Sequence, residues 1–124
     1  MTESFWLEDA KIAILTDSPI EGLDMADMAA SSGYGPAVLL RKSSALVCLL
    51  CEGEFRPRLV VLSRSLDTQE VTRCVDACKS ANAGVILVDN DLHADFFEPS
   101  CVLNRPFTFD DLKAAFSIVG LWKI

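Results

Sequence analysis

The sequence has little positive charge and no long apolar run. It contains 11 lysine and arginine residues against 18 aspartate and glutamate residues, which gives a net charge of −7 at pH 7. This balance argues against nonspecific binding to nucleic acid or to anionic membranes, because both require a basic surface. No apolar run reaches the roughly 18 residues that a membrane-spanning helix needs, and no signal peptide is recognisable. We therefore expect a cytoplasmic protein that contacts neither nucleic acid nor membrane directly.

Histidine is nearly absent, and the cysteines are not spaced as zinc ligands. The chain has one histidine, His93, and five cysteines. Cys48 and Cys51 form a C-x-x-C pair, but no second pair stands at zinc spacing. The pair also lies within an apolar helical run, not at a helix start, where thiolates are activated. We therefore expect reduced thiols that act as small hydrophobic groups, with no metal and no cofactor.

Five short apolar runs divide the chain at regular intervals. They cover residues 11–15, 36–40, 59–62, 85–88 and 101–103. A continuous run of this length is typical of a strand that is buried on both faces, as in parallel sheets. Hydrophobic residues make up 51% of the 124 residues, which is enough for a core. The sequence predicts a single domain over residues 1–124, with residues 1–10 as a lead segment.

Helix signals alternate with these runs. Ser18 with Glu21, and Asp67 with Glu70, have the spacing of capping boxes, and Thr108 caps the last helix. The expected helices cover about 19–32, 45–52, 68–83, a short stretch at 91–97, and 109–119. The alternation predicts a doubly wound α/β domain with a parallel sheet and right-handed crossovers.

Two of these helices carry informative apolar patterns. In the first, Ile20, Leu23, Ala26 and Ala30 are predicted to share the apolar face. The helix at 45–52 is apolar nearly all round, so it is either unusually buried or presents an interaction surface. If exposed, that helix and the aromatic ends of the chain would make the contacts of a partner or a homodimer. The candidate contact residues are Leu46, Val47, Leu49, Leu50, Phe5, Trp6 and Trp122.

Polar residues follow four of the predicted strands, and the carboxyl ends of parallel strands meet at one rim. With these strand ends, the chain resembles the receiver domain of bacterial two-component response regulators over nearly its whole length. The matching segments are 14–19, 33–34, 57–63 over the family pattern P-D-L-V-L-L-D, and 105–107 over K-P-F. The resemblance implies a flavodoxin-like fold with a five-stranded parallel sheet in the order 2-1-3-4-5.

The sequence departs from the family where receivers do their chemistry. In receivers, an acidic pair and a strand-three aspartate hold magnesium, and that aspartate accepts the phosphoryl group. Here Thr16 replaces one acid of the pair, while Asp17 keeps the other. Ser63 stands at the phosphoacceptor position, Asp89 at the hydroxyl position and Arg105 at the lysine position. The segment from Asp89 to Arg105 is short for the family, so its fourth helix is expected to be short or missing.

We interpret these five residues as a degenerate phosphoacceptor pocket. A serine hydroxyl is a poor nucleophile without an adjacent base, and the only histidine lies in another segment. Magnesium prefers carboxylate ligands, and the acid of the central strand is gone. Asp89 adds negative charge where a phosphoryl group would sit, and we expect it to form an ion pair with Arg105.

The resemblance therefore implies a pseudo-receiver, which regulates through protein–protein contact without phosphoryl transfer and is not an enzyme. Its partner would be a signalling kinase or an effector domain. The alternative is a ligand- or cation-responsive regulatory domain that binds a small molecule or ion in the pocket at the strand ends. A third hypothesis, a receiver phosphorylated on an unusual residue, has less support from these residues.

Overall fold

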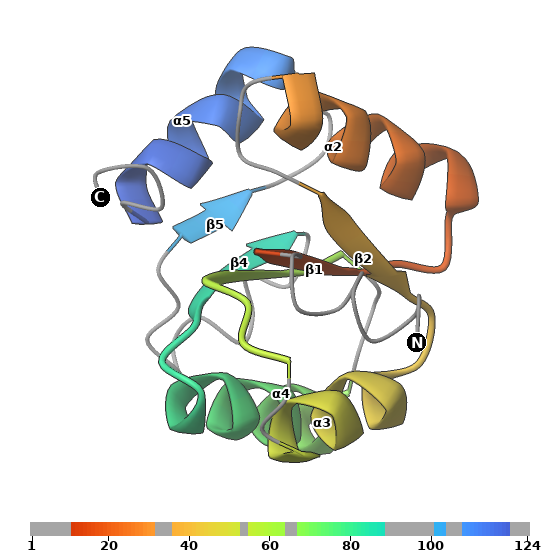
Figure 1. Ribbon diagram of the computed structural model, residues 1–124, viewed down its shortest axis with the longest axis vertical. Helices are drawn as coiled ribbons and strands as arrows, with labels where there is room; N and C mark the ends of the chain where they lie inside the picture. Colours follow the sequence, from red (N-terminus) through yellow and green to blue (C-terminus); the bar gives the residue numbers. More distant parts are fainter. Residues whose placement is uncertain are drawn as a thin grey trace.

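Strands and helices alternate along the chain in the computed structural model, which describes residues 11–31, 36–52, 55–63, 67–88, 101–103 and 108–119 (Figure 1). The strands are β1 (Ile12–Leu15), β2 (Ala37–Leu40), β3 (Leu59–Leu62), β4 (Gly84–Val88) and β5 (Cys101–Leu103). The helices are α2 (Pro19–Ser31), α3 (Ser43–Glu52), α4 (Thr68–Ser80) and α5 (Phe109–Val119). Within the described ranges, no helix has the length and apolar character needed to cross a membrane.

The strands form one parallel sheet in the order β2-β1-β3-β4-β5. β1 lies between two neighbours, with Ile12 opposite Ala37 of β2 and Leu59 of β3. This confirms the predicted parallel α/β sheet and the strand order 2-1-3-4, and the short β5 continues the sheet beside β4. The predicted lead segment at 1–10 and the expected short or missing fourth helix, between β4 and β5, lie outside the described residues.

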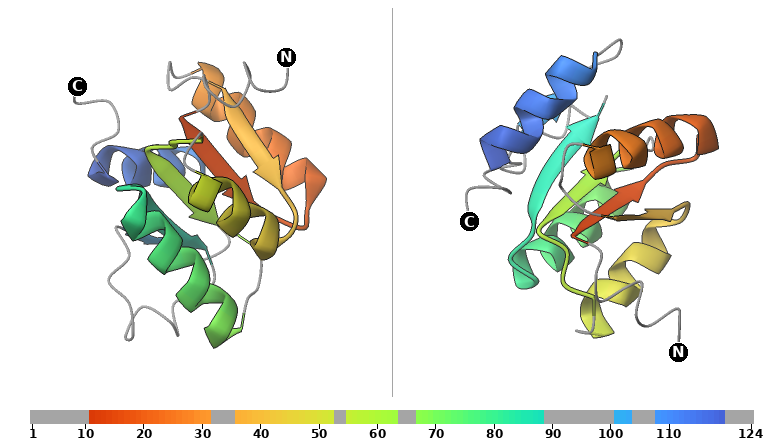
Figure 2. Two further views of the ribbon diagram at one scale, coloured as in Figure 1. Left: turned by 60° about the horizontal axis from the view of Figure 1, so that its bottom comes forward. Right: turned by 45° about the horizontal axis from the view of Figure 1, so that its top comes forward.

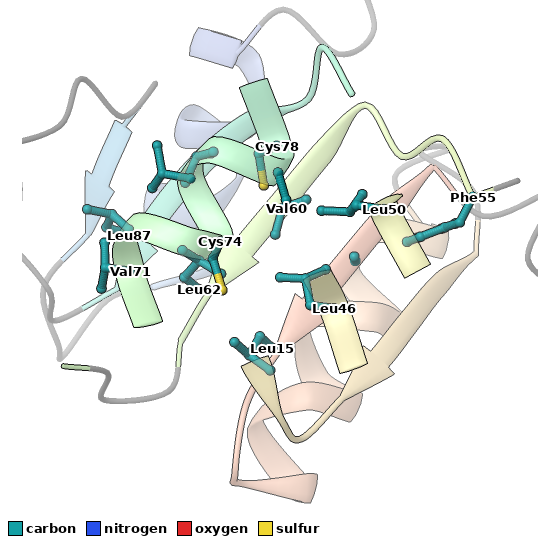
Figure 3. Close-up of a cluster of buried hydrophobic side chains, with 14 residues drawn as sticks. Leu15, Leu46, Leu50, Phe55, Val60, Leu62, Val71, Cys74, Cys78 and Leu87 are labelled. Carbon is teal, nitrogen blue, oxygen red and sulfur yellow. The ribbon is translucent and has the colours of Figure 1, made fainter. Parts of the chain in front are cut away.

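Helices cover both faces of the sheet: α2 and α5 lie on one face, and α3 and α4 on the other (Figures 1 and 2). Side chains alternate between these two layers along each strand. In β1, Ile12 and Ile14 pack with α2 and α5, whereas Ala13 and Leu15 pack with α3 and α4. Figure 3 labels Leu15 in the second of these clusters. All four residues are buried, which is why the strand is a continuous apolar run.

The capping box predicted at the start of α4 is present. The Glu70 N–H donates to Asp67 Oδ1 at 2.8 Å, and the Asp67 N–H donates to Glu70 Oε1 at 3.4 Å. Ser43 Oγ donates to the other oxygen of Glu70 at 2.8 Å, so this carboxylate also ties α3 to α4. The helix ends earlier than predicted: Asn82 takes a left-handed conformation (φ 59°), and Gly84 already belongs to β4.

The prediction for the apolar face of α2 was wrong for Ile20, Leu23 and Ala30, although Ala26 packs partly against the core. The helix buries Gly22, Met25, Met28 and Ala29, while Ile20 is 74% exposed and Leu23 is 56% exposed. The helix has apolar residues on two sides, so its sequence pattern does not decide which side faces the sheet. Gly22 decides it, because a residue without a side chain lets the helix lie close to the strands.

The apolar helix α3 is buried on one side only. Leu46 and Leu50 are buried in the cluster with α4 (Figure 3), and Val47 and Leu49 pack partly against it. The remaining candidate contacts, Phe5, Trp6 and Trp122, lie outside the described residues. The interaction surface expected on α3 is therefore reduced, because its two deepest leucines belong to the core.

The four cysteines whose side chains the structure describes fall into two classes. Cys74 and Cys78 are buried between α4 and the sheet, as expected for small hydrophobic groups, but Cys48 and Cys51 are exposed on α3. Burial raises the pKa of Cys74 to about 11 and that of Cys78 to about 12. The Glu52 carboxylate beside Cys48 raises the pKa of that thiol as well.

Thiol reactivity should follow these two classes. In a Cys101→Ser background at pH 8, we expect two thiols to react with Ellman's reagent in the native state, and two more only after unfolding. Glu52→Gln should speed the reaction of Cys48, because it removes the charge that disfavours the thiolate. Fast reaction of all four native thiols, resolved by peptide mapping, would contradict the burial of Cys74 and Cys78.

Candidate functional site

Two polar residues are buried at the carboxyl edge of the sheet. Thr16 follows β1 and is 4% exposed, and Ser63 follows β3 and is 3% exposed. Each continues the hydrogen bonding between neighbouring strands by one residue. The Thr16 N–H donates to Leu40 O at 2.9 Å, and the Ser63 N–H donates to Leu15 O at 2.8 Å. Since β1 and β3 are neighbours, the structure brings these two predicted residues to the same rim.

Of the other three predicted site residues, the structure describes Asp17 alone. Asp17 is exposed at the turn between β1 and α2. Asp89 and Arg105 lie outside the described residues, so their ion pair stays a prediction. Across the described ranges, no three histidine, cysteine, aspartate or glutamate side chains are grouped as they would be to hold a metal ion.

Glu21 is the site residue that sequence reasoning missed. Its carboxylate accepts a hydrogen bond from Ser63 Oγ, although the two residues are 42 positions apart. The contact links the first turn of α2 to the end of the central strand. The capping motif at Ser18 and Glu21 had suggested that this carboxylate would serve only the helix start.

The start of α2 is therefore only half of a capping box. The Glu21 N–H donates to Ser18 Oγ at 3.3 Å, as predicted. The reciprocal bond differs, because the Ser18 N–H donates to Thr16 Oγ1 at 3.1 Å. Thr16 thus does the capping work expected of Glu21 and leaves the Glu21 carboxylate available to Ser63.

This geometry contradicts the expectation that Ser63 has no adjacent base. It supports the argument that negative charge at this rim is unfavourable for a phosphoryl group. The hydroxyl does have a neighbouring base, the Glu21 carboxylate. By the resemblance, that base also brings a negative charge to the position where receivers accept a phosphoryl group. Phosphoryl transfer needs metal ions or cations to neutralise developing charge, and a carboxylate adds to that charge instead.

A hollow of about 180 Å³ lies beside this rim. Thr16 and Pro19 line it from the start of α2, and Leu39, Leu40 and Arg41 line it from β2. Of the predicted pocket residues that the structure describes, Thr16 lines this hollow, and Asp17 and Ser63 do not. Its walls are mostly apolar, so it suits an apolar side chain better than a hydrated ion.

Gly22 lets α2 lie against the strand ends. A Cβ atom at this position would be 2.9 Å from Thr16 Cγ2 and 3.4 Å from the two methyl carbons of Leu39. The Thr16 methyl cannot rotate away freely, because Thr16 Oγ1 accepts the hydrogen bond from the Ser18 N–H. The close approach of helix and strand therefore depends on glycine.

We expect Gly22→Ala to lower the free energy of unfolding by about 1–3 kcal/mol through overpacking. This is the overpacking cost alone, and the preference for alanine over glycine within a helix offsets about 1 kcal/mol of it. Thr16→Ser keeps the capping oxygen but removes the methyl group, so in that background Gly22→Ala should be neutral or stabilising. Urea unfolding of the four proteins in this cycle measures the coupling. An equal cost in both backgrounds would show that Leu39 limits the space.

Comparison with known proteins identifies the fold. No protein-family model matches the sequence, and no curated protein matches it. Solved structures do match. A response regulator receiver protein from Sinorhizobium medicae WSM419 has a TM-score of 0.70 and 19% identity, with 92% of this chain and 97% of that chain covered. The chain has the receiver fold.

Two further receivers match over similar lengths. The apo receiver domain of nitrogen regulatory protein C has a TM-score of 0.69 and 12% identity, covering 95% of this chain and 99% of that one. The receiver domain of a sensor histidine kinase from Pseudomonas aeruginosa PAO1 has a TM-score of 0.67 and 19% identity, covering 90% and 98%. Its structure has a magnesium ion coordinated in the active-site cleft. At such identities the likeness establishes the fold alone, so function is argued from the site.

Proposed function

We propose that this chain is a pseudo-receiver, a regulatory domain that works by contact with a signalling kinase or an effector domain and does not transfer phosphoryl groups. The observation that carries the proposal is the hydrogen bond between Ser63 and Glu21 at the end of the central strand. By resemblance, Ser63 stands where receivers have their phosphoacceptor aspartate.

Three features of the rim support this proposal. Ser63 offers a hydroxyl in place of a carboxylate, and it is almost completely buried. Thr16 removes one of the acids that would hold magnesium and uses its oxygen to cap α2 instead. Glu21 brings a carboxylate to the nucleophile position, where it repels an incoming phosphate. The first two changes remove groups that phosphoryl transfer requires, and the third opposes the approach of the donor, while the receiver fold stays intact around them.

Incubation with acetyl phosphate and magnesium tests the proposal. We expect intact-mass spectrometry to detect no added phosphate on this chain, while an ordinary receiver in the same reaction gains it. Tandem mass spectrometry would locate any phosphate that does appear. A stoichiometric mass gain mapped to Ser63, Asp17 or Glu21 would overturn the pseudo-receiver proposal and favour a receiver phosphorylated on an unusual residue.

The second candidate is a ligand-responsive regulatory domain, and the hollow beside Thr16 is the observation that favours it. A ligand that binds only the native state raises the melting temperature. A thermal-shift screen against magnesium, nucleotides and phosphoryl mimics separates the candidates. A shift that saturates with concentration and disappears in Leu40→Arg, which would fill the hollow, would favour ligand binding.

A further inference from the structure

Two exposed cysteines are neighbours on α3. Cys48 and Cys51 are three residues apart, so they share one face of this helix. Free cysteine is usually buried as a small hydrophobic group, and the core side of α3 is already formed by Leu46 and Leu50. Packing in the core therefore does not account for these two thiols.

Both cysteines line a hollow of about 290 Å³ between α3 and α4. From α4, Glu70 and Arg73 contribute to its wall. The Glu70 carboxylate serves the capping box of α4 and accepts the hydrogen bond from Ser43, whereas Arg73 is exposed and brings a positive charge to the hollow. The hollow thus combines two soft sulfur donors with one cation.

The two thiols are too far apart for a disulfide in an intact helix. Cβ atoms three residues apart on a helix are separated by about 5–6 Å, whereas a disulfide requires about 3.5–4.5 Å. The pKa of Cys48 is raised first by the Glu52 carboxylate and, among smaller causes, by Cys51, so the thiols are close enough to interact. An ion held between the two sulfur atoms would bridge this separation without distorting α3.

We propose that Cys48 and Cys51 bind Cu(I) between their sulfur atoms, a function beyond the proposed one and independent of phosphoryl transfer. Thiolates select soft ions, chiefly Cu(I) and Zn(II). Structural Zn(II) is almost always four-coordinate, and no group of three or more metal-binding side chains exists among the residues that the structure describes. Cu(I) accepts two ligands in a line, so it fits a site with two thiolates.

The sequence indicated no metal site here, because the pair lies in an apolar run and lacks a second pair at zinc spacing. The structure shows that both thiols are exposed. Zinc spacing does not bear on an ion that needs only two ligands. Neither reason therefore opposes a Cu(I) site at Cys48 and Cys51.

Binding exchanges two protons for one cation, and copper keeps its oxidation state. Each thiol loses its proton to water and two copper–sulfur bonds form, so the complex carries one negative charge. The Cys48 S–H donates to Glu52 Oε2 at 3.7 Å, and that carboxylate opposes the new charge. Arg73, in the wall of the same hollow, offsets it.

Competition with a coloured Cu(I) chelator tests the inference. Reduced protein in the Cys101→Ser background is titrated under nitrogen into the Cu(I) complex of bicinchoninate, whose colour is lost as the protein takes the metal. We expect one Cu(I) per chain, and the loaded protein should melt at a higher temperature. Cys48→Ser and Cys51→Ser should each weaken binding more than about a hundredfold, since loss of an outer-shell group alone costs roughly 10- to 100-fold.

The two charged neighbours should change the affinity in opposite directions. Arg73→Gln should weaken Cu(I) binding by about tenfold, because it removes the charge that offsets the complex. Glu52→Gln should strengthen binding several-fold, and both effects should shrink at high salt. Equal affinities of these two variants would overturn the placement of the ion in this hollow.

The matched control is Cys74→Ala/Cys78→Ala, which removes the buried pair of α4. It should bind Cu(I) like the parent protein, with circular dichroism showing that all variants are folded. Failure to take Cu(I) from the chelator, or equal binding by Cys48→Ser/Cys51→Ser, would overturn the inference. Zn(II) bound as tightly as Cu(I) would also overturn it, since that requires further ligands. One ion per two chains, with a dimer in sedimentation equilibrium, would overturn it in favour of a site shared between two copies.

Discussion

Replacing Ser63 by aspartate, the change that restores the receiver residue, is expected to lower the free energy of unfolding by about 2–4 kcal/mol at neutral pH. The Ser63 side chain is almost fully buried and donates its hydroxyl hydrogen to the Glu21 carboxylate. Aspartate removes that donor and sets a second carboxylate against the first with little water between them. Such a pair cannot easily carry two negative charges.

The pH dependence of the free energy of unfolding distinguishes charge repulsion from a poor steric fit of the aspartate. In the variant, repulsion would raise the pKa of one carboxylate above its unfolded value. Stability is then retained at low pH and lost as the pH rises through that raised pKa, so the deficit should grow from pH 4 to pH 7. In Ser63→Asn, the asparagine side chain has nearly the same size as aspartate but no charge. The stability of this variant should therefore show no such dependence on pH. Adding Glu21→Gln to Ser63→Asp should recover most of the loss.

Urea unfolding of these variants across that pH range makes the measurement. Ser63→Ala sets the reference, with a loss of about 1 kcal/mol for the hydrogen bond. If aspartate and asparagine are equally destabilising at every pH, steric fit and not charge limits this position. The result would also bear on function, because we expect that this substitution alone does not restore phosphoryl transfer, and a destabilised variant would be one reason.

The sheet could be predicted because burial on both faces leaves a strong local signal. Val60 packs in one helix layer and Val61 in the other, yet both stand in one continuous apolar run. Strand order was not contained in those runs. It came from the resemblance to receivers, and the pairing of β1 with both β2 and β3 agrees with it.

The face of α2 could not be predicted, because its sequence offers two apolar sides of similar strength. Hydrophobic spacing favours Ile20 and Leu23 as well as Met25 and Met28. The deciding feature is the distance between Gly22 and Thr16, which exists only once helix and strand are packed. Tertiary packing chose the side that brings the helix closest to the sheet.

The contact between Glu21 and Ser63 was missed for a related reason. Sequence spacing reports neighbours within a helix turn, and there Glu21 matched a capping box. The structure gives that capping role to Thr16. In the sequence, Thr16 indicated only that one acid of the receiver pair is replaced. Thr16 thus takes the capping role that the pattern gave to Glu21, and the Glu21 carboxylate contacts Ser63 instead. Only the folded arrangement of these residues at the rim shows this. The Asp89–Arg105 ion pair stays a prediction.

The stability of the helix layer formed by α2 and α5 should depend strongly on Phe116. This residue of α5 is completely buried in the cluster that also holds Met25 and Met28 of α2. Phe116→Ala would leave a cavity between the two helices and the sheet, and we expect a loss of about 3–5 kcal/mol. Phe116→Leu, which fills more of the space, should cost about 1–1.5 kcal/mol.

The same helix provides a matched control for this loss. Phe109 is 60% exposed, so Phe109→Ala should change stability by no more than about 0.5 kcal/mol. Urea unfolding of the three variants gives the comparison, and a lower melting temperature for Phe116→Ala should accompany it. Similar losses at both positions would mean that α5 is not held by its inward face. A large loss at Phe116 alone would show that burial on α5 anchors the helix layer whose other member, α2, carries Glu21.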